Sequence, residues 1–251
     1  METRFRRYRQ IADILFKYGL GIFIQRMFPG VHRFRLGREP PAESVATEYQ
    51  RIRMAIEELG PTYIKFGQIM STRPDILPPP LVKELKKLQD QTNPLPFEKI
   101  QTVIRDELPE YEDYFDGIEE KPLASASISQ VHRARLKDGT PVVLKVQRPG
   151  IETLIETDIL ILESFARRAE RAFPEWKFYN PRGIVNEFAN QIRKELDFIR
   201  DGTNADMLRN NMRSLPGVKV PKIYWEYSRR RLLVMEYIDG VRVDDTGAIR
   251  E

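Results

Sequence analysis

The sequence predicts an α+β fold in which a helical segment, residues 1–115, precedes a segment of strands and helices, residues 116–251. Apolar residues recur at helical spacing up to about residue 115. Near Lys121 the pattern changes to extended runs joined by Lys-Asp-Gly at 137–139, which is typical of a β-hairpin. The order expected after this point is three strands, two long helices and two further strands.

Apolar stripes mark each helix expected in the first segment. Residues 4–28 mix basic and apolar residues, and after a break at 38–44 a second helix starts at Glu43 or Ser44 and ends at Gly60. Pro61 suits the first turn of the next helix, which carries Lys65 and Gln68 and is followed by a triple proline that no helix interior accepts. Two shorter helices follow, at 81–90 and from residue 97 onward. The stripes comprise Ile11, Ile14, Leu15, Tyr18, Ile22 and Phe23, then Val45, Tyr49, Ile52, Ile56 and Leu59.

The second segment places a lysine in a strand with a clear alternation. Val142, Leu144 and Val146 share one face, so Lys145 lies on the opposite face. Long helices are expected at 148–173 and 180–212, and extended segments at 218–228 and 230–239.

The composition excludes several classes of chemistry. The chain has no cysteine, which excludes disulfides, thiolate metal sites and a cysteine nucleophile. His32 and His132 are the two histidines, too few for a histidine zinc site or a Ser-His-Asp triad, and we expect both to be surface or packing residues.

The net charge of +4 is concentrated at the N-terminus, where residues 1–39 hold nine Lys or Arg against three acidic residues. A basic end suggests an anionic partner surface, either phospholipid or nucleic acid. No stretch approaches the 18 uninterrupted apolar residues that a membrane-spanning helix needs. The most apolar segment, 11–28, lacks the cleavage site of a signal peptide.

The order of elements in the second segment suits a kinase-like small lobe. A loop of small residues lets backbone N–H groups approach phosphate oxygens, and a strand lysine adds a fixed positive charge. An acid on the following helix holds that lysine in position, and the last strand ends where an adenine ring would meet backbone groups. The expected phosphate loop comprises Leu123, Ala124, Ser125, Ala126, Ser127, Ile128, Ser129, Gln130 and Val131. Alanine resists positive φ, so phosphate coordination should differ from that of a glycine-rich loop.

At these residues the chain resembles the UbiB family of atypical kinase-like proteins, from about Glu48 to Asp245. "KFGQ" at 65–68 is similar to the family's KxGQ motif, and "STRPDILPPPLVKELKKLQD" to the segment that follows it. "PLASASISQVHRARLKDGTPVVLKVQRPGI" is similar to the alanine-rich loop and lysine strand, "KELDF" to the ExD motif, and "LLVMEYIDGVRVDD" to the hinge.

The resemblance implies a fold and a set of site residues. The fold is a helical KxGQ extension packed on a small lobe with a five-stranded antiparallel sheet, the large lobe being absent from this chain. Lys145 would bind nucleotide, and Glu236 and Tyr237 would form the hinge. The extension would cover the cleft and direct two gating side chains into it, with two acids as their charge partners. These four residues are Lys65, Gln68, Glu195 and Asp197.

The partner of Lys145 departs from the family pattern. It falls at Asp201, where the family has glutamate. Because aspartate is one methylene shorter, either the helix lies closer to the sheet or the pair is longer and weaker. Glu195 is the alternative partner, although it lies six residues away on the helix and therefore points in another direction.

The implied function is that of a UbiB-like atypical kinase or ATPase that supports isoprenoid-quinone (ubiquinone) biosynthesis. ATP or ADP would bind at the small lobe, and the Mg²⁺ ligands and catalytic groups would come from a large lobe. The chain holds no His-x-Asp followed by Asn and no Asp-Phe-Gly; "LDFIRDG" at 196–202 is expected on a helix. We therefore interpret the chain as an N-terminal fragment, inactive alone, with no catalytic residue of its own.

The alternative is a non-catalytic module with a pseudokinase-like lobe. It would bind an anionic membrane surface, an isoprenoid lipid or a protein partner through its basic amphipathic start. Proteins of quinone biosynthesis are the expected protein partners, and the expected location is the bacterial cytoplasm, at the periphery of the inner membrane. Nucleic acid is not favoured, because the basic residues alternate with aliphatic rather than stacking aromatic residues.

Overall fold

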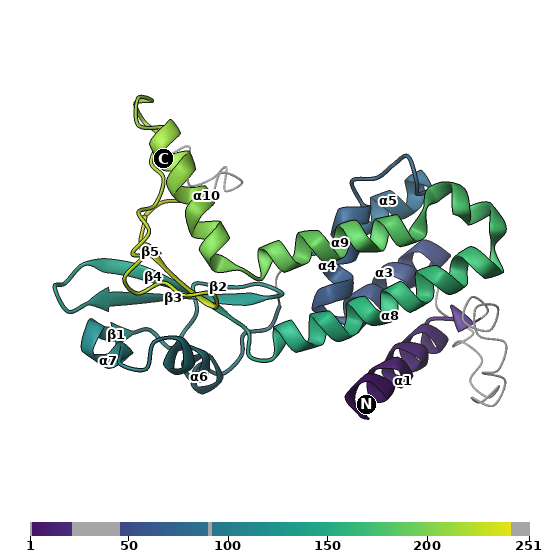
Figure 1. Cartoon of the computed structure of the whole chain (residues 1–251), viewed down its shortest axis with the longest axis horizontal. Helices are drawn as coiled ribbons and strands as arrows, with labels where there is room; N and C mark the ends of the chain where they lie inside the picture. The colour runs from purple at the N-terminus through teal and green to yellow at the C-terminus, as the bar shows by residue number, and fades with distance from the viewer. Residues whose placement is uncertain (1, 22–45, 90–91, 242–251) are drawn as a thin grey trace. The chain divides into compact units, whose positions relative to one another are not determined.

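The computed structural model describes residues 2–21, 46–89 and 92–241 (Figure 1). These residues form two compact units that alternate along the chain. The first unit comprises 1–92, 126–128 and 150–194, and the second 93–125, 129–149 and 195–251, within the described limits. This grouping differs from the division at residue 115 that the sequence suggested, because the helices after the lysine strand pack with the N-terminal helices.

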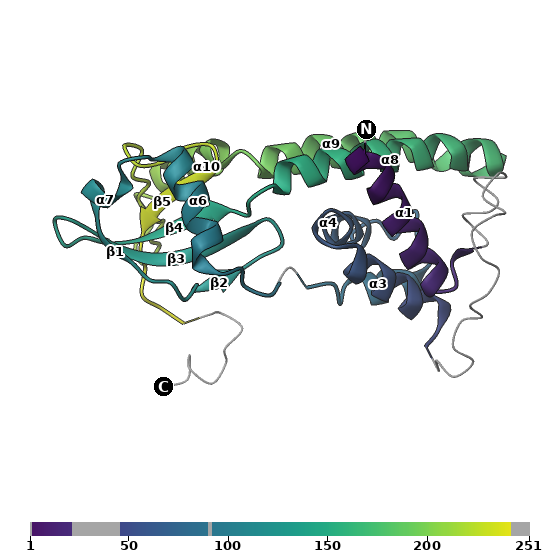
Figure 2. The same cartoon turned by 90° about the horizontal axis from the view of Figure 1, so that it is seen from below.

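The first unit is entirely helical. The long helix α8 (Ile151–Ala172), the 3₁₀ helix η1 (Pro174–Tyr179) and α9 (Pro181–Glu195) form a hairpin. The N-terminal helix α1 (Glu2–Lys17) contacts α3 (Glu48–Leu59) and α8, and α4 (Pro61–Met70) contacts α3, α5 (Pro79–Leu85) and α8. Figure 2 shows α1 crossing α8.

Local signals explain most of the helix ends. Thr47 caps α3 with a capping box, since its hydroxyl accepts from Gln50 N and Gln50 Oε1 accepts from Thr47 N. The helix therefore begins at Glu48, later than predicted; the expected start at Glu43 or Ser44 lies outside the described residues. Gly60, with φ of 96°, ends α3, and Pro61 starts α4 as predicted.

The triple proline does more than stop a helix. The helix α4 already ends at Met70, and Pro79 and Pro80 form the first turn of α5. Proline suits this position because the missing N–H has no helical partner there. The predicted helix from 81 thus begins two residues earlier and ends at Leu85.

The helices of the first unit approach one another closely at Gly67. A Cβ at this position would lie 2.5 Å from Leu88 Cδ1 and 3.4 Å from Ile56 Cγ2. Ile64, Met70, Leu85 and Leu88 form the adjoining core. A side chain at position 67, between Lys65 and Gln68, would therefore have to displace the end of the Leu88 side chain and would contact Ile56 of α3.

A buried ion pair fastens α1 to α8. The Arg7 guanidinium donates to both carboxylate oxygens of Asp158, at 2.7 and 2.9 Å, and to the carbonyl of Leu59 at 2.7 Å. Arg7 is 9% exposed and Asp158 is fully buried. Ile11 and Ile14 on the same helix are also buried, whereas Leu15 and Tyr18 of the apolar stripe predicted in 4–28 are half-buried. Ile22 and Phe23 lie outside the described residues.

The second unit contains a five-stranded antiparallel sheet, as predicted. Its path is β1 (Phe115–Ile118), β3 (Ser129–Leu136), β4 (Pro141–Gln147) and β5 (Leu232–Glu236), and β2 (Ala124–Ser125) pairs with β3. The predicted hairpin joins β3 to β4 through the Lys-Asp-Gly turn, in which Gly139 has φ of 89°.

Helices cover both faces of this sheet, as Figures 1 and 2 show. On one face, the stripe of Val142, Leu144 and Val146 packs with α6 (Phe97–Glu107) and α7 (Tyr111–Tyr114). On the other face, Leu233 packs with Phe198 of α10 (Phe198–Asn211). Lys145 lies on this second face, opposite the valine and leucine stripe, as the alternation predicted.

Two predicted elements differ from the structure. The helix expected at 180–212 is broken between α9 and α10, because Asp197 has an extended backbone and its carboxylate caps Ile199 N at 3.1 Å. The strand expected at 218–228 is reduced to one bridge between Ile223 and Met235. Pro221 has no N–H for a ladder, and 224–228 form turns.

We predict that Arg7→Ala lowers the free energy of unfolding by about 3–5 kcal/mol, because it leaves the Asp158 carboxylate buried without its partner. Urea unfolding followed by circular dichroism measures this change. Arg9→Ala is the matched control, since Arg9 lies exposed on the same helix. Replacing both partners by apolar residues, Arg7→Met with Asp158→Leu, should recover most of the loss. Equal midpoints for the Arg7→Ala and Arg9→Ala variants would contradict the role of the pair.

Candidate nucleotide-binding site

Lys145 and Asp201 form an ion pair within the second unit. Lys145 Nζ lies 2.6 Å from Asp201 Oδ2, and the side chains are 25% and 34% exposed. The amine also lies 4.4 Å from the centre of the Phe198 ring. Of the two geometries that the sequence left open, the longer and weaker pair is not the one found. Because both groups are partly exposed, the pair adds little to stability, but it fixes the direction of the lysine.

A glycine explains how α10 approaches the sheet closely enough for the short aspartate. A Cβ at Gly202 would lie 2.6 Å from Trp225 Cη2 and 3.1 Å from Leu233 Cδ1. The residue after Asp201 therefore has to be small for the helix to keep its place. Sequence reasoning missed this position, because the contact joins residues 23 apart in the chain.

The start of α10 is held by three further contacts. Phe198 is fully buried and its N–H donates to the carbonyl of Arg230 at 3.1 Å. Gln147, at the end of the lysine strand, donates from Nε2 to the carbonyl of Leu196. Asp197, predicted as a charge partner for the gating residues, caps the helix with its carboxylate. These contacts place Asp201 in the first turn of α10.

The predicted phosphate loop forms a short hairpin beside the lysine strand. Ala124 pairs with Val131 and Ser125 with Gln130, and Val131 in turn pairs with Lys145. Leu123, exposed, precedes β2; Ala126, Ser127 and Ile128 connect the strands, and Ser129 begins β3. Within the described part of the chain, Asn180 is the one non-glycine residue with positive φ, so this loop contains no glycine-type nest.

Arg148 is a cation of this region that sequence reasoning did not identify. Its Nη2 donates to Ser125 Oγ at 2.7 Å and to the carbonyl of Asn93 at 2.9 Å. Burial lowers the pKa of the guanidinium, which nevertheless stays charged at neutral pH. The signal was present as a second basic residue three positions after the strand lysine. Arg148 brings a second positive charge to the small-residue loop.

The Gln130 side chain forms hydrogen bonds on the buried side of the loop. Its Oε1 accepts from Leu95 N at 2.5 Å, and its Nε2 lies 3.2 Å from His132 Nε2. The other ring nitrogen of His132 lies 2.8 Å from the Glu119 carbonyl. Both side chains are fully buried, and burial lowers the pKa of the histidine. His132 is thus a packing residue, as expected, and Gln130 is engaged within the protein; His32 lies outside the described residues.

The loop also carries a buried hydroxyl. Ser127 is fully buried, and its Oγ has no hydrogen-bond partner among the described residues. An orphaned hydroxyl of this kind can bind an oxygen of a ligand or a water molecule.

The predicted hinge lies at the far end of β5 from Lys145. Lys219 pairs with Glu236 at 2.7 Å and lowers the pKa of its carboxyl group. The N–H of Glu236 donates to the Lys222 carbonyl at 2.8 Å, and that of Tyr237 to the Pro141 carbonyl at 3.3 Å. Both N–H groups therefore already have acceptors within the protein. The predicted contact with an adenine ring is left to other backbone groups of the hinge.

The predicted gating residues Lys65 and Gln68 lie on α4 in the first unit. Gln68 Nε2 donates to the carbonyl of Leu88 at 3.3 Å, and Lys65 is half-buried. Glu195 is the last residue of α9. Their role at a nucleotide site stays a prediction.

The described residues include neither a cluster of metal ligands nor a helix able to span a membrane. No three His, Asp or Glu side chains gather there closely enough to hold a metal ion. Among the helices described, none combines the length and apolar character needed to cross a bilayer.

A five-stranded antiparallel sheet whose central lysine pairs with a helix acid is the small lobe of a kinase-like protein. The comparisons agree with this class. The family model described as "ABC1 atypical kinase-like domain" matches residues 87–251.

Curated relatives and a solved structure extend the match. A Pseudomonas aeruginosa protein named "Probable protein kinase UbiB" is 40% identical over 98% of this chain and 48% of its own length. A Marinobacter nauticus protein of the same name is 36% identical over 99% of this chain and 46% of its own length. A structure of Mycobacterium tuberculosis Rv3197 in complex with erythromycin is 26% identical, with a TM-score of 0.50, over 78% of this chain and 49% of that one.

The chain belongs to the ABC1 family of atypical kinase-like proteins, among its UbiB members. It spans about half the length of the curated relatives it matches.

We predict that Gly202→Ala displaces α10 and lowers the free energy of unfolding by about 1–3 kcal/mol, because its methyl group would overlap the Trp225 ring. Urea unfolding measures the loss. Gly117→Ala is the control, since a Cβ there meets no atom within 4 Å. Trp225→Phe removes the overlapping ring atoms, so the double variant should be less destabilised by the alanine. Equal effects of alanine at positions 202 and 117 would show that close approach is not required.

Proposed function

We propose that the second unit binds ATP or ADP as the small lobe of a UbiB-like atypical kinase or ATPase. The observation that carries the proposal is the pair of Lys145 and Asp201 beside the small-residue hairpin. A lysine directed by an acid supplies a fixed charge to phosphate oxygens. Its partial exposure leaves room for an anion to reach the amine.

The loop would contribute in a different way from a glycine-rich loop. Its backbone has no positive φ, so it offers fewer converging N–H groups to a phosphate. Arg148, bonded to the Ser125 hydroxyl, compensates with a second positive charge. The donor set therefore fits a nucleotide phosphate chain.

Turnover by the whole protein would need groups beyond this lobe. A bound Mg²⁺ neutralises charge on the phosphates during phosphoryl transfer. We propose that its ligands and the catalytic acid belong to the part of the relatives that this chain does not match. Lys65, Gln68, Glu195 and Asp197 keep their proposed role as regulators of the pocket.

The process served by the whole protein is proposed from the family resemblance. We propose that it supports isoprenoid-quinone biosynthesis together with other proteins of that process, in the bacterial cytoplasm next to the inner membrane.

We predict that Lys145→Ala abolishes saturable binding of a fluorescent ADP analogue, measured by anisotropy. The variant loses the positive charge that Asp201 holds in position for the phosphates. Lys137→Ala should bind as the parent does, since Lys137 lies exposed in the turn between β3 and β4. Asp201→Asn should weaken binding by about tenfold through loss of lysine positioning, which corresponds to about 1.4 kcal/mol. An unchanged Kd for Lys145→Ala, with intact circular dichroism, would remove this lysine from the site.

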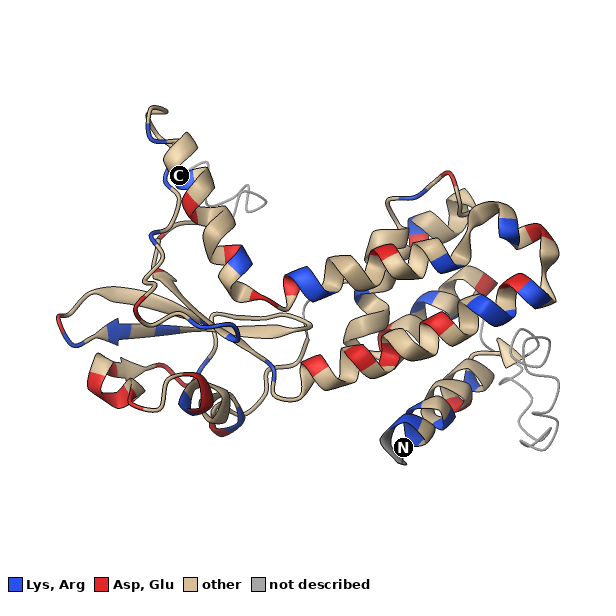
Figure 3. Cartoon of the chain, in the orientation of Figure 1, with Lys and Arg blue, Asp and Glu red and all other residues tan. Residues whose placement is uncertain are grey.

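A second candidate function is docking on an anionic membrane, and the surface of α1 favours it. Arg4, Arg6 and Arg9 are exposed on this helix, and Phe5 is 64% exposed among them. Figure 3 shows the basic residues along α1. The apolar stripe expected to enter the membrane is partly buried in the protein, through Ile11 and Ile14. We therefore propose electrostatic adsorption by the arginine face rather than insertion of the helix.

We predict that reversing the three exposed charges, Arg4→Glu, Arg6→Glu and Arg9→Glu, reduces cosedimentation with phosphatidylglycerol vesicles by about tenfold or more, since each basic residue near an anionic surface contributes about 1 kcal/mol. This variant is preferable to deletion of the helix, which would also remove the Arg7 pair. Lys83→Glu, Lys86→Glu and Lys121→Glu together form a control with the same charge change at other exposed sites. Equal losses in both triple variants would indicate a net-charge effect and refute docking through α1.

A further inference from the structure

Three aromatic side chains are exposed at the turn of the α8–α9 hairpin. Phe178 is 89% exposed, Tyr179 44% and Trp176 37%, all on η1. We call residues 171–182 the hairpin tip. Phe178 is the most exposed large apolar side chain in the part of the chain that the structure describes. Three exposed rings within four residues form a group of a kind that points to an interaction surface.

The tip is built to hold these rings in place. The Trp176 ring stacks on the buried Phe173 ring, with centroids 4.6 Å apart and an angle of 18°. Phe178 and Tyr179 form an edge-to-face pair with centroids 5.5 Å apart. Asn180, in the left-handed region, accepts from Gly183 N at 3.1 Å, and prolines stand at both ends of η1. The rings therefore need little further ordering on binding.

Basic residues flank the aromatic residues in the sequence. Between 167 and 182 the chain has five basic residues against two acidic ones. The basic residues are Arg167, Arg168, Arg171, Lys177 and Arg182, all exposed. Glu170 is one of the two acids. One of its carboxylate oxygens accepts from the backbone N–H of Arg182 at 3.4 Å, within the hairpin.

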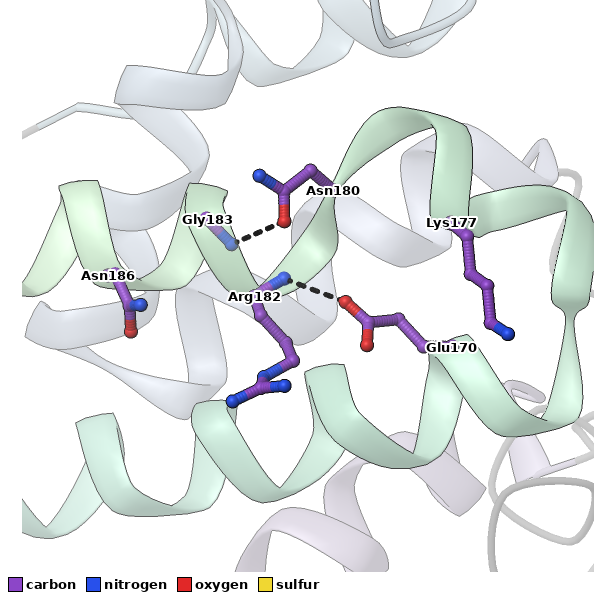
Figure 4. A pocket seen from close by; sticks show the side chains of 6 residues that line it. All are labelled: Glu170, Lys177, Asn180, Arg182, Gly183 and Asn186. Carbon is purple, nitrogen blue, oxygen red and sulfur yellow. Dashed lines mark hydrogen bonds between the residues drawn. The ribbon is translucent and has the colours of Figure 1, made fainter.

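Lys177 and Arg182 also line a shallow cavity of about 430 Å³ at the base of the tip. Figure 4 shows both side chains there beside Glu170, with Asn180 capping the start of α9. The tip therefore presents apolar rings next to cationic groups.

We propose that the hairpin tip docks on an anionic phospholipid bilayer, with Phe178 and Trp176 at the headgroup level. Tryptophan and tyrosine rings, which have a polar edge, concentrate at the membrane interface, and a phenylalanine ring beside them can enter the apolar side of that interface. Basic side chains contact anionic headgroups. A protein partner would need a pocket shaped to three rings at a hairpin end, whereas a bilayer accepts them without one. The hairpin tip shares no residue with the candidate nucleotide site or with the arginine face of α1.

Tryptophan fluorescence tests the proposal directly, because the chain has two tryptophans. Trp225→Phe leaves Trp176 as the sole reporter, and Trp176→Phe leaves Trp225. With phosphatidylglycerol vesicles, Trp176 emission should shift to the blue and be quenched by brominated lipid, while Trp225 emission should not change. Phosphatidylcholine vesicles should give a weaker effect, and added salt should reduce the effect with phosphatidylglycerol.

Cosedimentation in the otherwise unmodified chain provides the second measurement. Phe178→Ser should lower the partition coefficient on phosphatidylglycerol vesicles by about tenfold, as expected for loss of one buried phenyl ring. Leu160→Ser, at a 43% exposed position on α8, is the control.

Two results would overturn the proposal. One is unchanged Trp176 emission when the protein pellets with vesicles. The other is a dimer in sedimentation velocity that Phe178→Ser dissociates while vesicle binding is unaffected, which would assign the tip to a second copy of the chain.

Discussion

The candidate site depends on how closely one helix can approach the sheet. The α10 helix reaches its place because Gly202 has no side chain where it meets Trp225, and an aspartate can then contact Lys145 at 2.6 Å. A longer acid on a more distant helix could achieve the same pairing. In this chain the acid is the short aspartate, and the next residue is a glycine that lets the helix lie close to Trp225. Together the two residues fix the direction of the Lys145 side chain.

In the first unit, a buried charge pair has the corresponding role. Arg7 and Asp158 join the N-terminal helix to the long hairpin helix, and apolar contacts of Ile11 and Ile14 accompany them. Because these contacts use the inner face of α1, its arginine face is left exposed to other partners. The same hairpin carries exposed aromatic rings at its turn. Each surface proposed for binding is therefore what internal packing leaves uncovered.

Local signals in the sequence predicted much of this structure, and contacts between distant residues account for most of the rest. Three features depend only on residues that are neighbours in the sequence, and each was predicted. They are the helix boundary at Gly60 and Pro61, the Lys-Asp-Gly hairpin and the face of the strand on which Lys145 lies. The break at Asp197 was not, because a helical pattern runs through it and the extended backbone there is held by its own cap. The roles of Gly202 and Arg148 depend on Trp225 and Ser125, which no local pattern links to them.

The side-chain bonds around the β2–β3 hairpin have a thermodynamic consequence. Arg148 holds Ser125, Gln130 is bonded to Leu95, and no residue of the loop uses the backbone freedom of glycine. A ligand that binds to a loop held by these hydrogen bonds would restrict few additional backbone motions. Its association should therefore carry a small conformational entropy term, and its heat capacity change should reflect surface burial rather than ordering of the loop.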